Sequence, residues 1–245
     1  MKQLPTSLEK QTILDAISEV IFDNEEDIEI LFSKTYNILD KKGWDFAKMP
    51  IMNLSPEIRK NDKTFLIAPH YKFTKDNINI FIGPSIFAFS LSGLESYTGW
   101  KDYKNNLSEV IKDLEKVFFH LNIKQISMKY IDFFKELNIF ENLEIQINDD
   151  FYSDLYGECE DSKQYTKKFE YNNLHIQTTI DNGISLNFQN SNEVVNGSIV
   201  DINIAKANIK VSEIMNEFDS IHKEIKNIFF NLLKDDFIES MTPTY

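Results

Sequence analysis

Residues 107–121 have the sequence LSEVIKDLEKVFFHL, and residues 211–225 follow the same apolar pattern with VSEIMNEFDSIHKEI. In both stretches apolar residues recur at intervals of three and four, which predicts a helix with one buried face. The two patterns differ at one apolar position, where Phe118 in the first corresponds to His222 in the second. Strand-like stretches precede each helix. The sequence therefore predicts two similar α+β halves, 1–122 and 123–245, packed tightly together as one unit.

The remaining elements are predicted from alternation, caps and turns. Residues 12–22 repeat isoleucine at helical spacing, but their β-branched side chains favour a strand. A helix is expected next, with Asn24 as its N-cap and Gly43 just past its end. Asp181-Asn182-Gly183 predicts a hairpin turn. Further strands are expected at 64–73, 77–82, 85–92, 123–134, 142–148, 170–180, 183–190 and 196–209, with an irregular connection at 45–62 and an excursion at 149–168.

The predicted sheet has two unlike faces. In the strands after residue 122 one row of side chains is apolar and the other is polar, which is typical of an antiparallel sheet with helices on one face. The order of elements approximates a β-α-β4-α unit used twice, as in TATA-box-binding-protein-like topologies. If the sheet is curved, its polar row becomes a concave binding surface; simple solvation of that row is the alternative. Candidate binding residues on it are Gln177, Asn187, Asp201 and Asn203.

The charge of the chain restricts its partners. Its formal net charge is −13, from 39 acidic and 26 basic residues, and Arg59 is its single arginine. Proteins that bind a phosphate backbone usually cluster lysine and arginine, so direct nucleic-acid binding is not expected. The acidic surface suits a protein partner, or it serves only solubility.

Location follows from what the sequence lacks. No apolar run reaches the roughly 20 residues that span a bilayer, and residues 1–10 lack the apolar centre of a signal peptide. Cys159 is the single cysteine, so no intrachain disulfide forms. We therefore expect a cytoplasmic protein without membrane association. An exposed sheet edge would also permit a homo-oligomer.

No motif of the sequence establishes an activity. The four histidines (His70, His120, His175 and His222) are dispersed without the paired spacing of metal ligands, so no metal is expected. No glycine-rich phosphate loop and no GxSxG elbow is present. Cys159 lies between two glutamates, which disfavour a thiolate. We therefore expect no cofactor and no catalytic residue, and an enzyme is not the favoured class.

Four short motifs carry a resemblance to a known family. They are Tyr97-Thr98-Gly99-Trp100, Lys129-Tyr130-Ile131-Asp132, Asp201-Ile202-Asn203, and His222 on the final helix. Through them, and over nearly its whole length, the chain resembles a sporadically distributed prokaryotic family of uncharacterised proteins. That family prefers arginine at the position of Lys129, where lysine offers no bidentate ion pair. The resemblance implies no activity, but sporadic distribution suggests genes of defence, toxin neutralisation or phage countermeasures.

Several motif residues are expected to gather in the core. His222 falls in the middle of the apolar face of the final helix, and Asp132 shares a strand face with Tyr130. A cluster of Tyr130, Asp132 and His222 is therefore expected, with Tyr97 and Trp100 anchoring a helix to the sheet. The cluster either satisfies a buried histidine as part of the core or provides a proton-transfer or ligand group.

Two functions are compatible with these features. The favoured one is a non-catalytic binding or inhibitory protein that acts on a macromolecular partner through its acidic surface or polar sheet face. The alternative is a small-molecule or nucleotide-binding domain, with weak hydrolysis as an extension, that uses Asp201, Asn203 and His222.

Overall fold

The computed structural model describes residues 3–94, 96–118, 121–145, 163–187 and 194–245. In this part of the chain nine strands form one antiparallel sheet, in the order β3-β4-β5-β6-β2-β7-β10-β9-β8. The predicted α+β fold with an antiparallel sheet is confirmed. The strands are β2 (Ile13–Asp23), β3 (Asp45–Lys48), β4 (Tyr71–Lys75), β5 (Ile78–Gly83), β6 (Ile86–Ser92), β7 (Asn122–Lys135), β8 (Gln164–Tyr171), β9 (Leu174–Asn187) and β10 (Val194–Ala207).

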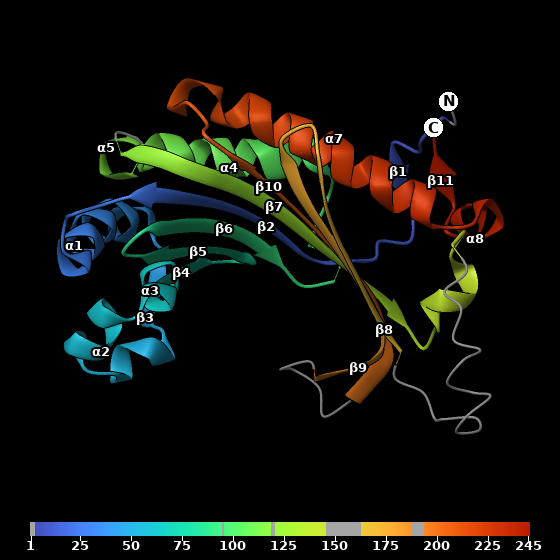
Figure 1. The fold of residues 1–245 in the computed structure, drawn as a ribbon, viewed down its shortest axis with the longest axis horizontal. Coiled ribbons are helices and arrows are strands. Elements are labelled where there is room, and N and C mark those ends of the chain that lie inside the picture. Colours follow the sequence, from blue (N-terminus) through green and yellow to red (C-terminus); the bar gives the residue numbers. More distant parts are fainter. Residues whose placement is uncertain (1–2, 95, 119–120, 146–162, 188–193) are drawn as a thin grey trace.

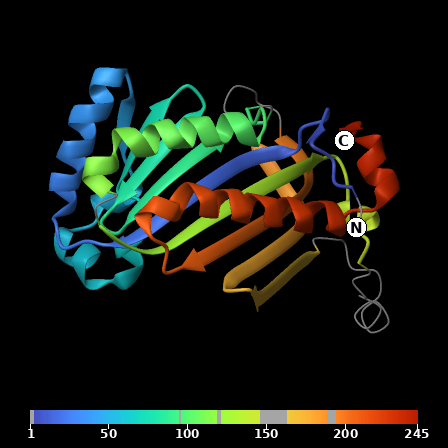
Figure 2. The same ribbon diagram turned by 90° about the horizontal axis from the view of Figure 1, so that it is seen from above.

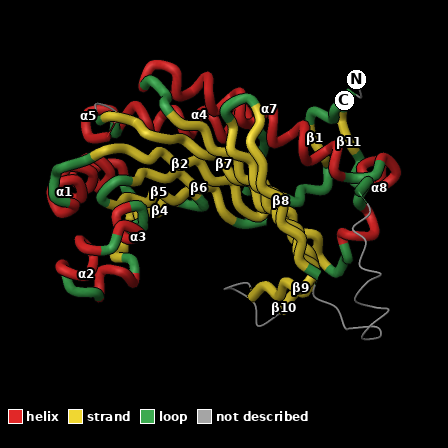
Figure 3. Tube along the Cα trace, viewed as in Figure 1, coloured by secondary structure: helices red, strands yellow, loops and turns green. Residues whose placement is uncertain are grey.

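The long helices α4 and α7 cover one face of this sheet (Figure 1). The helices are α1 (Ile28–Leu39), α2 (Pro56–Asn61), α3 (Lys63–Leu66), α4 (Trp100–Asp113), α5 (Glu115–Phe118), α7 (Ile214–Leu232) and α8 (Asp235–Ser240). Figures 1 and 2 show α4 and α7 side by side over the sheet, with α1 at one end. The strands curve beneath them (Figure 3), and the far face of β2, β7 and β10 carries no helix in the described residues. We call that far face the open face.

The core lies between the helices and the sheet. Fully buried side chains from the strands include Val20, Phe89 and Met128, and those of α7 include Phe218 and Ile221. The latter two belong to the predicted apolar stripe of 211–225, whose burial is confirmed from Ile214 to Ile225, whereas Val211 precedes α7 and is exposed. The first stripe also faces the core, but the helix is interrupted at Leu114, between α4 and α5. Apolar side chains removed from water on this scale supply most of the driving force for folding.

The strand order has an internal symmetry. The strands that open the two predicted halves, β2 and β7, pair at the centre of the sheet, and the strands that precede α4 and α7, β6 and β10, flank them. A duplicated unit would give this order, although the second range supplies one strand fewer among the described residues. The TATA-box-binding-protein-like topology and the division at residue 122 stay predictions.

The predicted strand at 12–22 is confirmed as β2, but the cap of the following helix differs. Asp27, not Asn24, is the N-cap of α1, and its side chain accepts from the Glu29 backbone N–H at 3.0 Å. Asn24 instead accepts from the Glu26 N–H and donates to the Pro84 carbonyl, so it ties the connection to the sheet. Both residue types can cap a helix, and position alone does not separate them.

Three other expected stretches need correction. Residues 64–66 belong to α3, which Asp62 caps through the Thr64 N–H, so the strand begins only at Tyr71. The connection at 45–62 is not wholly irregular, because it contains β3 and α2. The expected strand at 142–148 is replaced in its described part by a 3₁₀ turn, Ile139–Asn142, and an isolated bridge at Leu143. Residues 146–162, with Cys159 and most of the expected excursion, lie outside the described residues.

The predicted hairpin turn at 181–183 is wrong. β9 runs through it from Leu174 to Asn187, and the turn lies at Asn172-Asn173, whose φ angles of 49° and 63° suit a two-residue hairpin loop. Asp181-Asn182-Gly183 forms a bulge instead, where β9 carries one residue more than the facing segment of β10. Asp181 Oδ1 accepts from the Gly183 N–H at 2.8 Å. The same local chemistry can thus bend a strand as well as end it.

One glycine of the sheet allows a close approach of two strands. A Cβ atom at Gly197 in β10 would lie 2.2 Å from the Phe134 carbonyl oxygen of β7. We expect Gly197→Ala to lower the free energy of unfolding by about 1–3 kcal/mol, because the paired strands must separate to admit the methyl group. Urea unfolding measures this. The control is Val194→Ala on the same strand, whose exposed side chain predicts a change within about 0.5 kcal/mol. Equal midpoints for all three proteins would contradict the close approach.

Candidate functional site

The four motifs divide between the two faces of the sheet. Successive side chains of β7 alternate, so Tyr130 and Asp132 point toward the helices while Lys129 lies on the open face. Tyr130 meets His222 of α7, and Lys129 meets Asp201 of β10. The motif residues therefore form two groups that the central strands separate.

On the helix face, a chain of hydrogen bonds links three motif residues. The hydroxyl groups of Tyr97 and Tyr130 are 3.0 Å apart, and the Tyr130 hydroxyl lies 3.0 Å from His222 Nδ1. Burial raises the pKa of both tyrosines, so both hydroxyls keep their protons. Tyr97 comes from the segment before α4, Tyr130 from β7 and His222 from α7. The chain therefore connects three elements that are distant in sequence.

Trp100 joins the first helix of this group to the last. Its ring stacks on His222 with a centroid separation of 4.3 Å and an interplanar angle of 7°. Its Nε1–H donates to Asp219 Oδ1 at 2.8 Å, and Lys104 also pairs with that carboxylate. Gly99 precedes Trp100 with a φ of 124°, a conformation that favours glycine. These contacts of Trp100 join α4 to α7, and the anchoring of a helix to the sheet that the sequence suggested stays a prediction.

His222 is neutral at ordinary pH. Burial lowers the pKa of its imidazole to about 4, and the positive charge of Lys226 acts in the same direction. Lys226 lies one turn after His222 on α7. The sequence prediction did not include Lys226, although helical spacing from His222 places the two residues side by side. A neutral ring accepts or donates at each nitrogen but carries no charge for a ligand.

The hydrogen-bond partner of Asp132 is Thr12 and not the expected His222. Its Oδ1 accepts from the Thr12 hydroxyl at 2.6 Å, and the side chain is only 4% exposed. Burial raises the pKa of this carboxyl to about 7, and the Thr12 bond opposes that rise. No hydrogen bond reaches its second oxygen from any residue that the structure describes. Thr12 was not predicted, because nothing in its position before β2 marks it as a partner.

These groups line one cavity of about 130 Å³. Tyr97, Trp100, Tyr130, Asp132 and His222 all contribute to its wall. The apolar part comes from further residues of the core and of the N-terminal segment, among them Leu8, Ile13, Ile225, Phe229 and Phe230. A cavity of about 150 Å³ can hold a molecule the size of benzene, so this one suits a ligand of similar size.

The two ends of the chain lie beside the cavity. Thr6, Ser7 and Leu8 line it, and β1 (Ser7–Leu8) pairs with β11 (Pro243–Thr244). The Thr6 N–H donates to the Thr244 carbonyl at 2.6 Å. Figure 1 shows the N and C ends together next to α7. We call β1 with β11 the terminal strap. Its short segments carry no periodicity, so the sequence did not predict it.

The open face gathers three of the four predicted binding residues. Lys129 Nζ lies 3.5 Å from Asp201 Oδ2, and burial raises the pKa of this carboxyl while Lys129 opposes the rise. Asn203 pairs in register with Lys129 and Gln177. Among the described residues, Asn203 Oδ1 is buried without a hydrogen-bond partner. It borders a hollow that also includes Gln177 and Phe169, a phenylalanine that is 43% exposed.

Asn187 does not join the other three. It pairs with Val194, seven residues along β10 from Asp201, and therefore lies on the opposite side of the strand. The extra residue of the bulge in β9 causes this change of face, since a slip of one residue inverts every later side chain.

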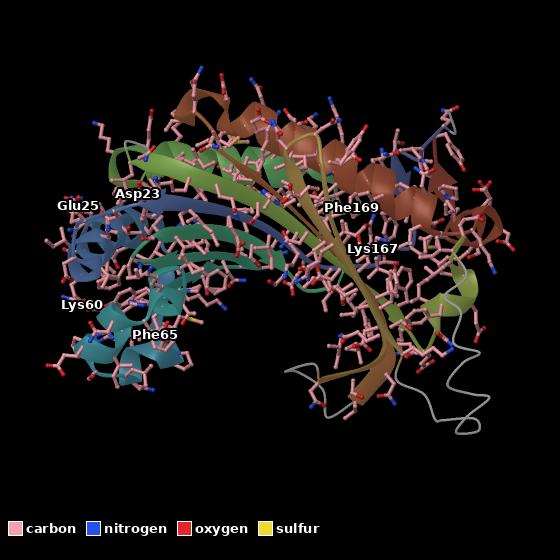
Figure 4. All side chains as sticks on the ribbon, viewed as in Figure 1. Asp23, Glu25, Lys60, Phe65, Lys167 and Phe169 are labelled. Carbon is pink, nitrogen blue, oxygen red and sulfur yellow. The ribbon has the colours of Figure 1, made fainter. Side chains whose placement is uncertain are left out.

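Further side chains are labelled in Figure 4. Lys167 and Phe169 belong to β8, an edge strand of the sheet, and Lys60 and Phe65 lie in the α2–α3 region. Lys60 pairs with Asp27 at 3.2 Å, so this cation is partly compensated. Phe169 pairs in register with Ile176, whose row faces the helices, so its exposed side chain lies on the opposite side of the sheet from Gln177 and Asn203.

Comparisons with known proteins do not add a relative. Neither protein-family models nor curated proteins give a match to the chain, so the family resemblance stays a prediction. In the part of the chain that the structure describes, no three His, Cys, Asp or Glu side chains gather as metal ligands. Among the same residues, no helix has both the length and the apolar character that crossing a membrane requires.

The hydroxyl of Tyr130 gives a direct test of the hydrogen-bonded chain. We expect Tyr130→Phe to lower the free energy of unfolding by about 1–3 kcal/mol, because Tyr97 and His222 both lose their buried partner. Chemical denaturation at neutral pH measures the loss. Tyr171→Phe is the control, since that side chain is exposed. A Tyr130→Phe protein as stable as the wild type would show that the chain contributes nothing to folding.

Proposed function

We propose that the protein binds a small molecule in the cavity beneath α7. One observation carries this proposal: residues of three separate motifs surround one cavity, whose wall holds a buried carboxylate with an oxygen free of hydrogen bonds to described residues. Ligand sites typically combine an apolar wall with a few fixed polar groups. Tyr130, Asp132 and His222 are such groups, and each is held by a strand, a helix or a hydrogen bond.

This proposal favours the second function considered from the sequence, a small-molecule-binding domain, over a protein that binds a macromolecular partner. The proposed binding site is the cavity and not the predicted polar face of the sheet. We assign binding and no catalytic role to this site. Its tyrosines and its histidine are neutral and hydrogen-bonded to one another, which suits positioning of a ligand.

A thermal-shift screen with small amines, alcohols and carboxylates of up to about eight heavy atoms tests the proposal. A ligand at 100 times its dissociation constant stabilises the folded state by about 2.7 kcal/mol, which shifts the melting temperature by several degrees. The blocking variant is Ile13→Phe, since Ile13 lines the cavity. The matched control is Ile17→Phe, on the same strand but on the open face. A shift that survives Ile13→Phe and disappears in Ile17→Phe would contradict the proposed site.

A second candidate is a protein partner bound on the open face. One observation favours it: Asn203 Oδ1, in the hollow that it shares with Gln177, is buried without a partner among the described residues. A partner that donates a hydrogen bond to this oxygen would satisfy it. The cytoplasmic location and the role in defence or counter-defence belong to this candidate and stay predictions.

An affinity pull-down from the native host tests the second candidate. We expect a stoichiometric protein that binds the wild type and Asp132→Asn equally and is lost with Asn203→Leu, which removes the unpaired oxygen. Phe169→Asp is the control, because Phe169 is exposed near the same edge of the sheet but pairs in register with Ile176 on the helix face. Retention by Asn203→Leu, or the absence of a stoichiometric protein, would count against the open face as the interface.

A further inference from the structure

We propose that the ligand of this cavity carries an ammonium group that pairs with Asp132, on an apolar body about the size of a benzene ring. The inference rests on the proposed small-molecule function and adds the chemical class of the ligand. It starts from a carboxylate that the fold buries without supplying a cation.

Three other acidic side chains with limited exposure have a positive partner close by. Lys104 pairs with Asp219, Lys206 with Glu217, and Lys129 with Asp201. Asp132 is more deeply buried than these, yet its described contact is the neutral Thr12 hydroxyl. An ionised carboxylate in such a place is costly unless a positive group and hydrogen bonds compensate it. A ligand ammonium group would provide both.

Lys226 does not fill this role. It lines the same cavity, but no ion pair joins it to Asp132 within the described residues, and its charge is not among the influences on the pKa of that carboxyl. Lys226 is also partly exposed, so water screens its repulsion of a bound cation. A ligand can therefore place a positive group at Asp132 while Lys226 stays at its own position.

The other walls suit the body of an amine. Trp100, Tyr97 and Tyr130 line the cavity, and aromatic side chains can attract a cation. Ile225 and Phe229 of α7 add apolar surface. The two tyrosine hydroxyls are already bonded, to each other and to His222, so the free oxygen of Asp132 is the strongest anchor left for a polar group.

Two matched probe sets test the charge of the ligand. We would measure binding of benzylamine, benzyl alcohol and benzoate, and of n-butylamine, n-butanol and butyrate, by isothermal titration calorimetry and by NMR at pH 8. The expected result is at least a tenfold tighter binding of one amine than of its alcohol and its carboxylate. Asp132→Asn should remove this preference and leave alcohol binding unchanged. Asp201→Asn, which removes a carboxylate from the open face, should leave the preference intact.

A pH series supplies a readout that a purely structural Asp132 would not change. Amine binding should weaken up to tenfold for each pH unit below about 7, because the carboxyl must then release a proton. The alcohols face the same Tyr97, Tyr130, His222 and Lys226 and should show no such change. Equal affinities for amine and alcohol, with both lost in Ile13→Phe, would overturn the ammonium inference and leave the proposed function standing. No binding of any of the six probes to the wild type would overturn both.

Discussion

Asp132→Asn is expected to make the protein more stable at pH 8, by about 2–4 kcal/mol in the free energy of unfolding. The carboxyl has an ordinary pKa of 3.8 when the chain is unfolded and one of about 7 in the folded protein. Each pKa unit corresponds to about 1.4 kcal/mol, and the roughly three units here give the upper end of the range. Asparagine has nearly the same shape, keeps an oxygen for the Thr12 hydroxyl, and is never ionised.

The sign of this effect sets its pH dependence. Between pH 4 and 7 the folded protein holds a proton on Asp132 that the unfolded chain has released, so the stability of the wild type falls as the pH rises. The penalty is complete above about pH 7 and absent below about pH 4. The advantage of Asp132→Asn should therefore be largest at pH 8, smaller at pH 5 and close to zero at pH 4.

Urea unfolding of the two proteins at these three pH values measures the prediction. Asp201→Asn is the control on the opposite face, where Lys129 already compensates the carboxylate. Removing the charge of Asp201 should therefore give no comparable gain in the free energy of unfolding at pH 8. A loss of stability for Asp132→Asn at every pH would show that the carboxylate supports the fold, and it would remove the ground for a ligand at this position.

A charged residue that lowers the stability of the fold is commonly found in an active or binding site, where it serves function. The same variant connects stability to function here. If an ammonium ligand pairs with Asp132, the same concentration of amine should stabilise the wild type more than it stabilises Asp132→Asn. The two proteins would then differ less in the presence of the ligand than in its absence.

The sequence predicted the architecture well where the pattern was long. Residues 211–225 repeat apolar side chains over four turns, and Phe218 and Ile221 are buried as that spacing requires. Short signals were less reliable. Asp181-Asn182-Gly183 has the composition of a turn, but the pairing of β9 with β10 continues past it to Asn187 and turns it into a bulge. Local preference there is outweighed by the ladder of hydrogen bonds with β10.

The candidate site was predictable only in part. Strand phase brought Tyr130 and Asp132 to one face, and helical phase put His222 opposite them, so the contact of Tyr130 with His222 followed from the two periods. Thr12 and the terminal strap did not, because they depend on how the ends of the chain fold back. Long-range contacts of that kind leave no periodic trace in the sequence.

His222→Phe is expected to destabilise the protein at neutral pH and to stabilise it at acidic pH. Phenylalanine occupies the corresponding position, Phe118, in the first of the two helical stripes. At pH 7.5 the variant should be less stable than the wild type by about 1 kcal/mol, since it loses the hydrogen bond to Tyr130. At pH 4.5 the variant should be more stable than the wild type by about 1–2 kcal/mol, because burial of the imidazole then destabilises the folded wild type.

The acidic half of this prediction follows from the lowered pKa of His222. Below pH 6.5 the unfolded chain binds a proton on this imidazole, whereas the folded protein does so only near pH 4. The wild type therefore loses stability as the pH falls through this interval, by up to about 3 kcal/mol before partial exposure of the ring reduces the effect. Phenylalanine has no such proton. Asp132 titrates in the opposite direction in both proteins, so its contribution cancels in the difference.

Denaturation curves at pH 7.5, 6 and 4.5 for the wild type, His222→Phe and His175→Phe measure this reversal. His175 is exposed and pairs with Glu170 away from the cavity, and its replacement should not change the sign of the stability difference between neutral and acidic pH. A constant difference between His222→Phe and the wild type at all three pH values would mean that the imidazole is as easily protonated in the folded protein as in water. In that case the chain from Tyr97 to His222 would be open to solvent, and the cavity wall would not be the dry surface that an apolar ligand body requires.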